Sequence, residues 1–359
     1  MLMNTHPSSQ SRPLLSICVP TFNRADCLAH LLTCLAGLKA THGADLDICV
    51  SNNHSADGTA RVIDSFRDRL ALRAVTQSTN IGATRNAMEV TRLATGRWIL
   101  IVGDDDEFDP ATFGTLLTFL RTAEEGLWVL VGVRNDTGMG YLRDLRPGPH
   151  SAPGFRRAML RTGLSPFGFI GMHVFPAALR PQFLALSLED AQPWPHLALF
   201  LRHLAAGPVH VFPIPVVNQA AGGKELFWHQ GDWARINLMK LNIVAGARRA
   251  VNSYRWFSDT LILRELDSVT NLRALLSWKT YEPVDFQSTA LAECMARYRL
   301  LGPMALLTAP HCTVLLVAYC TPVGVLRLLL RLTGRGGMVS RYVDRKTSLG
   351  RFDGVRRGL

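Results

Sequence analysis

The sequence predicts an α/β fold with a mostly parallel, doubly wound sheet flanked by helices. Three observations support this prediction. Five short apolar runs alternate with segments of about ten or more residues that have helical periodicity. Loops of small and polar residues follow several of these runs. The run Trp98–Val102 leads within two residues to Asp104, Asp105 and Asp106, as a buried parallel strand does when it delivers ligands to the edge of a sheet.

The first part of the chain repeats the order strand, turn, helix. Leu14–Thr21 is an apolar run that ends beside a proline, and a helix-like segment from Ala25 to about Lys39 follows it. Leu46–Val50 is the second apolar run. The small polar residues Ser51–Thr59 then suit a loop that faces a ligand, before a predicted helix at Ala60–Arg69.

The same order continues through the next strands. The predicted elements are a strand at Leu72–Thr76, a polar turn at Asn80–Gly82, a helix at Ala83–Leu93, the strand Trp98–Val102, a helix from Pro110 to about Glu124, a strand at Leu127–Val133 and a later helix at His196–Ala206. Because such strands run parallel, we expect the loops at their carboxyl ends to form the functional site.

The three successive aspartates predict a cation site. Adjacent carboxylates repel one another, so a fold that gathers them normally supplies a hard cation such as Mg²⁺ or Mn²⁺. The alternative is an acidic turn that also caps the next helix, since Asp109-Pro110 fits an N-cap followed by proline at the first helical position. A cap needs one carboxylate and not three, which favours the cation site.

Composition and charge limit the class of protein. The chain has 359 residues with 48% apolar content, enough for two domains or for one domain with a large appendage. Residues 1–13 have no secretory leader pattern and predict a loose polar tail on a protein that stays in the cytoplasm. The seven cysteines form no C-x-x-C pair, which indicates reduced thiols without zinc or disulfides.

The net charge of +11 lies in the second half of the chain. Residues 1–136 have 12 Lys/Arg and 15 Asp/Glu, a balance of −3, which leaves +14 for the remainder. Residues 300–326 contain no charged side chain but several prolines, and residues 327–359 have nine Lys/Arg against two Asp. This order predicts a re-entrant or interfacial segment followed by a basic helix on an anionic membrane surface. The alternative is that the uncharged span packs on protein.

Four sequence blocks, in this order and spacing, resemble the family 2 glycosyltransferases, and most closely the bacterial sugar transferases of the abequosyltransferase type. The blocks are Ser16–Arg24, the Ser55-x-Asp57-Gly58-Thr59 loop, Asn80-x-Gly82-x-x-x-Asn86, and Ala94-Thr95-Gly96-x-Trp98 leading to the D-x-D motif at Asp104–Asp106. The resemblance implies a GT-A fold, a nucleotide-diphosphate sugar donor, a divalent cation (Mn²⁺ or Mg²⁺), inversion at the anomeric carbon and a lipid acceptor linked to undecaprenyl diphosphate. It also implies work in O-antigen or similar polysaccharide synthesis, at the cytoplasmic face of the inner membrane.

The resemblance also implies roles for individual residues. Asp104 and Asp106 would hold the metal, and Asp105 would bind it through water or hold a ribose hydroxyl. Arg85 and Asn86 would lie near the sugar or diphosphate, although Arg85 also fits a solvated helix charge. The residues expected to contact the donor are Pro20, Thr21, Asn23, Arg24, Asn52, Asn53, Asp57, Asn80, Gly82, Arg85, Asn86, Asp104 and Asp105.

One departure from the family pattern affects the choice of donor. Asn52 and Asn53 replace the usual acidic residues of the loop that reads the base, while Asp57 remains. An amide can accept from a pyrimidine N–H and donate to a carbonyl, so uracil or thymine is still readable. We therefore favour a UDP- or dTDP-sugar, with a guanine nucleotide left open.

An inverting transfer needs a group that takes the proton from the acceptor hydroxyl. Asp190, then Glu189, then His196 are the candidates, since they lie where the family keeps its acidic base. The alternative is an ordinary acidic turn before a helix.

Residues 149–166, rich in Gly, Pro and Arg, predict a mobile cover or acceptor loop. Gly222–Lys224 begins a second candidate lid. The aromatic side chains that follow could stack on a sugar ring or, alternatively, pack in the hydrophobic core; they are Phe227, Trp228 and Trp233.

These predictions divide the chain into a tail (1–13), a catalytic domain (14–230), a helical region (231–299) and a segment that associates with membrane (300–359). The chain lacks the Gln-x-x-Arg-Trp signature of processive synthases, which favours addition of one sugar per encounter. Two other classes of protein fit the sequence less well. A nucleic-acid-binding protein would need a basic, aromatic-rich motif that the chain lacks, and the intact acidic cluster disfavours a catalytically silent scaffold that only binds nucleotide sugars.

Overall fold

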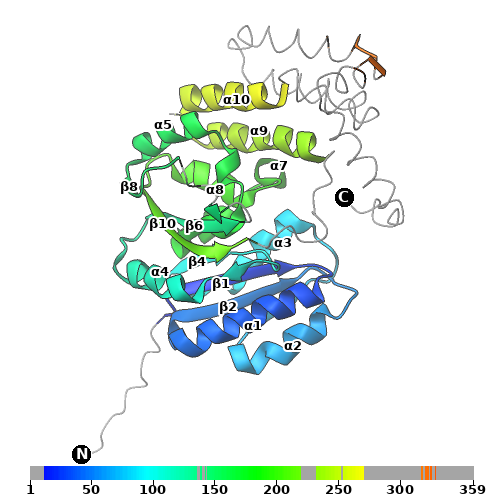
Figure 1. The fold of residues 1–359 in the computed structure, drawn as a ribbon, viewed down its shortest axis with the longest axis vertical. Helices are drawn as coiled ribbons and strands as arrows, with labels where there is room; N and C mark the ends of the chain where they lie inside the picture. The colour runs from blue at the N-terminus through cyan, green and yellow to red at the C-terminus, as the bar shows by residue number, and fades with distance from the viewer. Residues whose placement is uncertain are drawn as a thin grey trace, which may run out of the picture. The chain divides into compact units, whose positions relative to one another are not determined.

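A computed structural model describes residues 12–135, 138–139, 142, 144–219, 232–251 and 254–270, together with isolated positions between 317 and 328. The chain divides into two compact units (Figure 1). The first comprises residues 1–158, 165–188 and 194–224, and the second comprises residues 159–164, 189–193 and 225–359. All described strands belong to the first unit.

The strands of the first unit form one sheet. They are β1 (Leu15–Thr21), β2 (Leu46–Asn52), β3 (Arg73–Thr76), β4 (Trp98–Ile101), β5 (Glu107–Phe108), β6 (Trp128–Asn135), β7 (Gly138–Met139), β8 (Gly148–His150), β9 (His173–Pro176) and β10 (Val209–Asn218). Among the described residues their order is β3-β2-β1-β4-β9-β6-β10-β5, with β7 beside β6 and β8 beside β10. β1 to β4 pair in parallel, and so do β6 and β10, whereas β9 is antiparallel to both of its neighbours.

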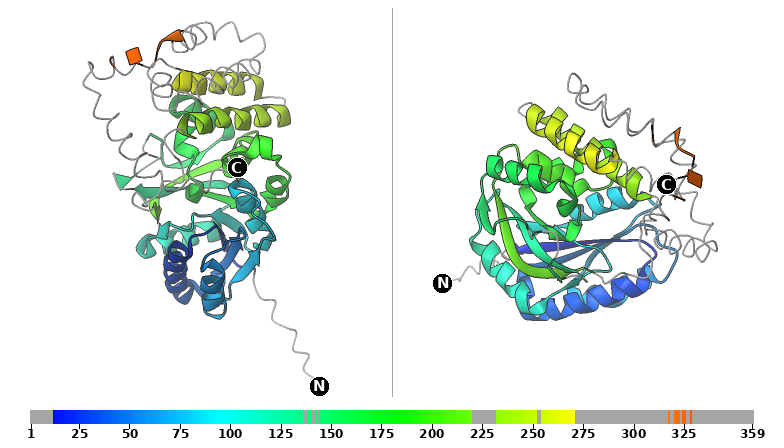
Figure 2. Two further views of the ribbon diagram at one scale, coloured as in Figure 1. Left: turned by 90° about the vertical axis from the view of Figure 1, so that its right-hand side faces the viewer. Right: turned by 45° about the horizontal axis from the view of Figure 1, so that its top comes forward.

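Helices cover both faces of this sheet. They are α1 (Ala25–His42), α2 (Thr59–Leu70), α3 (Ala83–Glu89), α4 (Pro110–Thr122), α6 (Arg180–Leu184) and α8 (Pro195–His203). Two further helices, α5 (Ala152–Thr162) and α7 (Leu188–Ala191), lie where the chain passes from one unit to the other. Helices α1, α2 and α4 lie on one face, and α3, α6 and α8 on the other (Figure 2). β1, β2 and β4 are therefore buried on both sides, which explains their nearly continuous apolar sequences.

The predicted fold class is confirmed. The five predicted strands correspond to β1, β2, β3, β4 and β6, and the predicted helices to α1, α2, α3, α4 and α8. Asp109 is the N-cap of α4 and accepts a hydrogen bond from the Ala111 amide, so capping needs none of the three preceding aspartates. β9 and β10, which the sequence patterns do not predict, complete the sheet.

The prediction of a mobile loop at 149–166 is wrong. This segment contains the end of β8 and the whole of α5. Phe155 and Met159, one helical turn apart, are fully buried. Pro153 stands in the first turn, where a proline's missing N–H leaves no helical hydrogen bond unmade. The high Gly, Pro and Arg content thus conceals an amphipathic helix.

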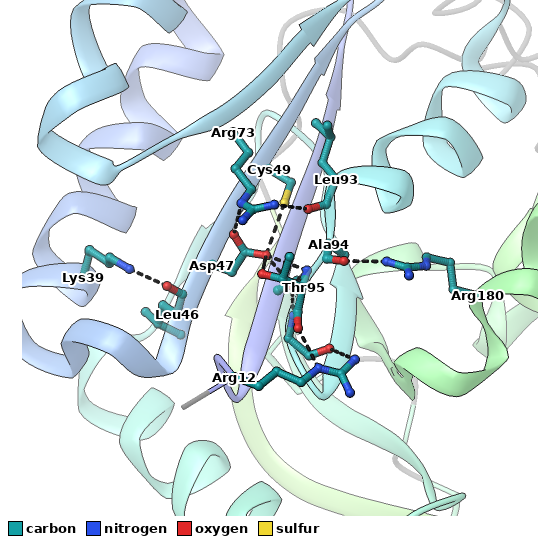
Figure 3. Close-up of polar contacts among 12 residues, drawn as sticks. Arg12, Lys39, Leu46, Asp47, Cys49, Arg73, Leu93, Ala94, Thr95 and Arg180 are labelled. Atoms are coloured by element: carbon teal, nitrogen blue, oxygen red, sulfur yellow. Dashed lines mark hydrogen bonds and ion pairs between the residues drawn. The ribbon is translucent and has the colours of Figure 1, made fainter. Parts of the chain in front are cut away.

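A buried carboxylate joins the amino ends of the central strands (Figure 3). Asp47, at the start of β2, accepts hydrogen bonds from the Ser16 hydroxyl and from both the amide and the hydroxyl of Thr95, each at 2.8 Å. Arg73 Nε lies 3.3 Å from its other oxygen. This network fixes the loop before β4. Gly96 belongs to the same loop, because a Cβ there would stand 2.7 Å from the Ser16 amide nitrogen.

We expect the substitution Asp47→Ala to lower the free energy of unfolding of the protein by about 2–4 kcal/mol, because it leaves buried donors without an acceptor. Urea denaturation of the full chain measures this loss. The matched control is Asp64→Ala, which removes an exposed i,i+3 ion pair with Arg67 and should change stability by less than about 0.5 kcal/mol. Similar losses for both variants would contradict the assignment of Asp47 as a structural carboxylate.

The second unit contains the helices α9 (Asp232–Ala250) and α10 (Arg255–Thr270). Lys240 of α9 is fully buried, and its ammonium lies 3.1 Å from a carboxylate oxygen of Glu265 in α10. The other oxygen of Glu265 accepts the Leu164 amide at 2.7 Å. The ion pair therefore joins α9, α10 and the segment 159–164.

Several predicted features fall on residues outside this description. They are the second candidate lid at Gly222–Lys224 with Phe227 and Trp228, the side chain of Trp233, and almost all of residues 300–359. Within the described residues, no helix combines the length and the apolar character needed to cross a bilayer.

Candidate functional site

The carboxyl ends of β1, β2 and β4 meet at one edge of the sheet. Thr21 and Asn52, the last residues of β1 and β2, are register partners, and so are Pro20 and Ser51. On the other side of β1, the Val102 amide donates to the Cys18 carbonyl at 3.0 Å, which extends the β1–β4 pairing toward Asp104. The loops that follow these three strands therefore surround a common region, as the strand order predicts.

Thr21 and Arg24 contact the first two aspartates. The Thr21 hydroxyl donates to Asp104 Oδ2 at 2.6 Å. Arg24 Nη1 donates to Asp104 Oδ1 at 2.8 Å and to Asp105 Oδ2 at 2.7 Å. Asp104 and Asp106 are each only 4% exposed. A single guanidinium nitrogen thus bridges two carboxylates, and both oxygens of Asp104 have a protein donor.

Burial and pairing oppose each other in this group. Burial raises the pKa of Asp104, although hydrogen bonds from Thr21 and Arg24 act in the opposite direction. Burial alone would lower the pKa of Arg24, but the hydrogen bonds and charges of Asp104 and Asp105 outweigh it and raise that pKa above its ordinary value. Arg24 consequently remains a cation at every physiological pH and offsets part of the negative charge.

Gly103 permits the close grouping of the carboxylates. A Cβ at this position would lie 2.9 Å from both Asp105 Oδ1 and Asp106 Oδ2. The two oxygens therefore approach one point over the turn, and any other residue at position 103 would push them away. The turn is closed by the Asp106 amide, which donates to the Gly103 carbonyl at 3.3 Å.

The loops after β1 and β2 are joined by Asn23 and Asp57. The amide of Asn23 donates to the Ser55 hydroxyl, and Asn23 Oδ1 accepts from the Ala56 amide, both at 2.8 Å. Asn23 has a φ of 52°, in the left-handed region that asparagine tolerates. Asp57 accepts from the amides of Ala25 and Thr59, both at 3.0 Å, and so satisfies the first turns of α1 and α2.

The pKa of Asp57 reflects these bonds. Burial alone would raise it, but the hydrogen bonds from Thr59 and from the Ala25 amide hold the pKa below its ordinary value. Asp57 is therefore an ionised carboxylate whose oxygens organise two helix starts.

The predicted base-reading asparagines are both buried. Asn53 donates to Asn80 Oδ1 at 2.8 Å and accepts from the Ile81 amide at 2.9 Å, so both ends of its amide hold the turn at Asn80–Gly82. Asn52 Oδ1 accepts from the Ser55 amide at 3.0 Å. Asn52 Nδ2 has no hydrogen-bond partner within the described parts of the chain. The Asn52 amide nitrogen is thus the one with no protein partner among the described residues, although Asn52 is fully enclosed.

Asn86 and Gly82 also shape this edge. Asn86 donates to the Ser51 carbonyl at 3.0 Å and accepts from the Ser51 hydroxyl at 2.6 Å, which ties α3 to the end of β2. Gly82, at φ +82°, starts α3 from a conformation that favours glycine, and its amide donates to Asn80 Oδ1 at 2.9 Å.

Four further predicted site residues have other neighbours. Arg85 is exposed on α3, with its Nε 3.6 Å from Glu89. Asp190 and Glu189, on α7, both face Arg249 of α9 within the second unit, at 2.5 Å and 3.8 Å. His196 is 1% exposed, with its ring centroid 4.7 Å from that of His173. Burial, followed by the neighbouring His173, lowers the pKa of His196 well below its usual range.

Ser51, Ser55 and Gln77 also organise the edge, although none of them is among the residues expected to contact the donor. Ser51 and Ser55 belong to the predicted ligand-facing loop, whereas Gln77 belongs to no predicted motif. Gln77 Nε2 donates to the Ser51 hydroxyl at 3.0 Å, and the Gln77 amide donates to the Asn52 carbonyl at 2.9 Å. The position of Gln77, directly after the third predicted strand, is the one signal that would have identified it.

The aspartates provide the type of ligand atom that a divalent cation such as Mg²⁺ prefers. Their oxygens are hard donors, and Asp105 and Asp106 each direct one of them to the point that a Cβ at Gly103 would fill. No group of three or more metal-ligating side chains is arranged to hold an ion anywhere in the described residues. Mg²⁺ is commonly bound through only one or two carboxylates, with substrate phosphates and water completing the shell. The residues present therefore fit a cation that binds together with a phosphate-bearing ligand.

Comparison with known proteins identifies this architecture. The family described as Glycosyl transferase family 2 matches residues 16–179, a range that includes β1 to β4 and the three aspartates. Residues 16–179 belong to glycosyl transferase family 2. The glycosyltransferase domain resembles abequosyltransferase RfbV of Salmonella typhimurium, with 32% identity over 136 residues, which is 37% of this chain and 40% of that protein.

A second relative has a similar level of identity, and a solved structure shares the fold. A GalNAc(5)-diNAcBac-PP-undecaprenol beta-1,3-glucosyltransferase of Campylobacter jejuni is 31% identical over 117 residues, which is 32% of this chain and 36% of that protein. These two matches thus span about two fifths of the length of the relatives. The structure of S. aureus TarS 1-349 in complex with UDP superposes with a TM-score of 0.59 at 15% identity, over 85% of this chain and 89% of that one. The glycosyltransferase domain thus has the GT-A fold.

Proposed function

We propose that this protein is an inverting glycosyltransferase. It transfers one sugar from a nucleotide-diphosphate sugar, with UDP or dTDP favoured, to a lipid-linked saccharide in the synthesis of a bacterial polysaccharide. The observation that supports the proposal most strongly is the contact of Arg24 and Thr21 with Asp104 and Asp105, at the carboxyl edge of the sheet in a family 2 domain.

The chemistry fits these residues. Sugar transfer from a diphosphate passes through an oxocarbenium-like state while negative charge grows on the leaving group. A divalent cation, when bound, would neutralise that charge, and Asp104 and Asp106 would hold it. Thr21 fixes the orientation of Asp104 through its hydroxyl, and Gly103 keeps the carboxylates close together.

The donor base is proposed to meet the end of β2. Asn52 Nδ2 has no partner within the described residues, so it has donors for a carbonyl of uracil or thymine. Because Asn52 is fully enclosed, this contact requires the loop Ser51–Thr59 to move when the base enters. Asn53, Asn80 and Gly82 would act by holding the loops around the base, because their hydrogen bonds already join those loops to one another.

Asp190 remains our proposed base for the acceptor hydroxyl, with Glu189 second. The exposed fraction of the Asp190 side chain is 14%, whereas His196 is almost completely enclosed. An enclosed imidazole is poorly suited to meet an acceptor, which supports ranking His196 last.

The acceptor is proposed to be an undecaprenyl-diphosphate-linked saccharide at the cytoplasmic face of the inner membrane. The printed name of the Campylobacter relative contains such a lipid. The uncharged span 300–326 and the nine basic residues that follow it would bring the protein to anionic lipid, as a peripheral or re-entrant contact.

One experiment tests both parts of this proposal. The full chain is incubated with Mn²⁺, a panel of UDP-, dTDP- and GDP-sugars, and vesicles of anionic lipid that contain undecaprenyl-diphosphate saccharides. We expect Mn²⁺-dependent transfer from a UDP- or dTDP-sugar, and sedimentation of the protein with anionic but not neutral vesicles. Tight binding of a nucleotide sugar without any turnover would instead support the alternative, a catalytically silent scaffold. Absence of sedimentation would contradict the membrane contact.

A further inference from the structure

Arg24 occupies the position in which a cation would be expected beside Asp104. Its Nη1 lies 2.8 Å from Asp104 Oδ1 and 2.7 Å from Asp105 Oδ2. The second oxygen of Asp104 accepts the Thr21 hydroxyl. Both oxygens of this carboxylate are therefore engaged by protein donors.

A guanidinium and a divalent cation cannot share Asp104 Oδ1 without strong repulsion. The two cations would stand within a few ångströms of each other in a region where Asp104 is only 4% exposed, so water screens their charges weakly. Binding of a metal ion to Asp104 in this arrangement therefore requires that Arg24 move away or that a further anion offset the added charge.

Arg24 is anchored through its backbone and carries its charge on a long side chain. At the N-terminus of α1 the Arg24 carbonyl accepts the Leu28 amide at 3.0 Å. The side chain is 23% exposed, so part of it faces solvent. A diphosphate is the natural second partner, because a guanidinium forms paired hydrogen bonds with phosphate oxygens.

We infer that Arg24 is a built-in counter-cation that makes metal binding depend on the donor. In the free protein it occupies the carboxylates of Asp104 and Asp105 and keeps divalent cations weakly bound. When the donor enters, its diphosphate attracts the guanidinium away from the carboxylates, and the metal ion takes its place. This inference rests on the proposed function for the identity of the donor. The predicted competition between Arg24 and the metal ion does not depend on which donor binds.

The test measures the dissociation constant of Mn²⁺ by electron paramagnetic resonance, with the full chain, in the absence and presence of saturating UDP. The variant Arg24→Met removes the charge and keeps an apolar stem of similar reach. We expect it to bind Mn²⁺ alone at least about tenfold more tightly than the wild type, since the carboxylates lose their internal partner. We also expect UDP to tighten Mn²⁺ binding at least about tenfold in the wild type and much less in the variant.

Two further variants complete the design. Arg24→Lys retains a positive charge and should restore weak binding of Mn²⁺ alone, and it gives a second measurement if Arg24→Met folds poorly. Arg67→Met changes the net charge equally at an exposed position on α2 and should behave as the wild type. Thermal unfolding of each variant confirms that it is folded.

The outcomes separate the two proposals. Unchanged or weaker binding of Mn²⁺ alone by Arg24→Met would overturn the inference. Arg24 would then only hold the carboxylates of Asp104 and Asp105 in place. If neither UDP nor dTDP binds to the wild type, the proposed donor is wrong. Even then, the comparison of Mn²⁺ binding between Arg24→Met and the wild type decides whether Arg24 competes with the metal ion.

Discussion

The substitution Asp106→Asn is expected to lower the rate of sugar transfer by at least about a thousandfold, because it removes a carboxylate that would hold the cation at the leaving diphosphate. The asparagine has nearly the same shape as the aspartate. Asp106 is 4% exposed and lies in the turn closed by its own backbone bond to Gly103, so we expect the fold to remain intact. Initial rates with saturating Mn²⁺ and donor, together with a circular dichroism spectrum, measure both effects.

Asp64→Asn provides the control for this substitution. Asp64 is an exposed residue of α2, and its loss changes the net charge by the same amount. Its transfer rate should equal that of the wild type. Undiminished activity of Asp106→Asn would show that the cation, if one is required, depends on other ligands.

The substitution Asp190→Asn is expected to reduce transfer by about a hundredfold to ten-thousandfold, the range associated with loss of a general base. Binding of the donor should stay close to that of the wild type, because the acceptor proton plays no part in it. Transfer is measured with the lipid-linked acceptor, and donor binding by calorimetry with the unreactive UDP.

The contact with Arg249 allows a structural role of Asp190 to be separated from a catalytic one. Arg249 donates to Asp190 Oδ1, and a Cβ at Gly246 would lie 2.5 Å from the Asp190 carboxyl carbon, so this carboxylate also packs on α9. If Asp190 acts only through this packing, Arg249→Gln should lose as much transfer as Asp190→Asn. We expect Arg249→Gln to retain transfer within about tenfold of the wild type. Loss of transfer in Glu189→Gln, with Asp190→Asn active, would assign the base to Glu189.

Much of the fold could be predicted from sequence because β1, β2 and β4 are buried on both faces. Their apolar runs are continuous, and each ends in a polar loop that leads to a helix. Both the position of the strand and its direction can therefore be predicted from the sequence. The three aspartates follow from the same logic, since a strand of a parallel sheet must end at the ligand-binding edge.

The second half of the sheet could not be predicted in this way. β9 is only four residues long and runs antiparallel between β4 and β6, so no strand–helix repeat marks it. β10 contains Pro213 and Pro215, which normally argue against a strand, and its register with β6 shifts at both sides of Pro215. Pairing with distant strands decides the conformation of both segments.

Hydrogen bonds among the site residues were equally hidden. The sequence places Asn53 and Asp57 in a loop that faces a ligand, but it does not show that Asn53 would be engaged by Asn80 or that Asp57 would serve two helix starts. Such pairings join loops that are distant in the chain. Patterns within one loop therefore identify the region of the site better than they identify the contacts of each residue.

The buried Asp47 network has a consequence for altering this protein. Ser16 and Thr21 mark the two ends of β1, separated by five residues or about 17 Å along the strand. Ser16 contacts Asp47, whose network stabilises the fold. Thr21 contacts Asp104, which belongs to the proposed active site. Libraries that vary the loops after β1 and β2, but retain Asn23, Asn53 and Asp57, can therefore change the proposed donor site while the Asp47 network preserves the opposite end of the sheet. Stabilising changes around Asp47 can be added beforehand to widen the tolerated variation.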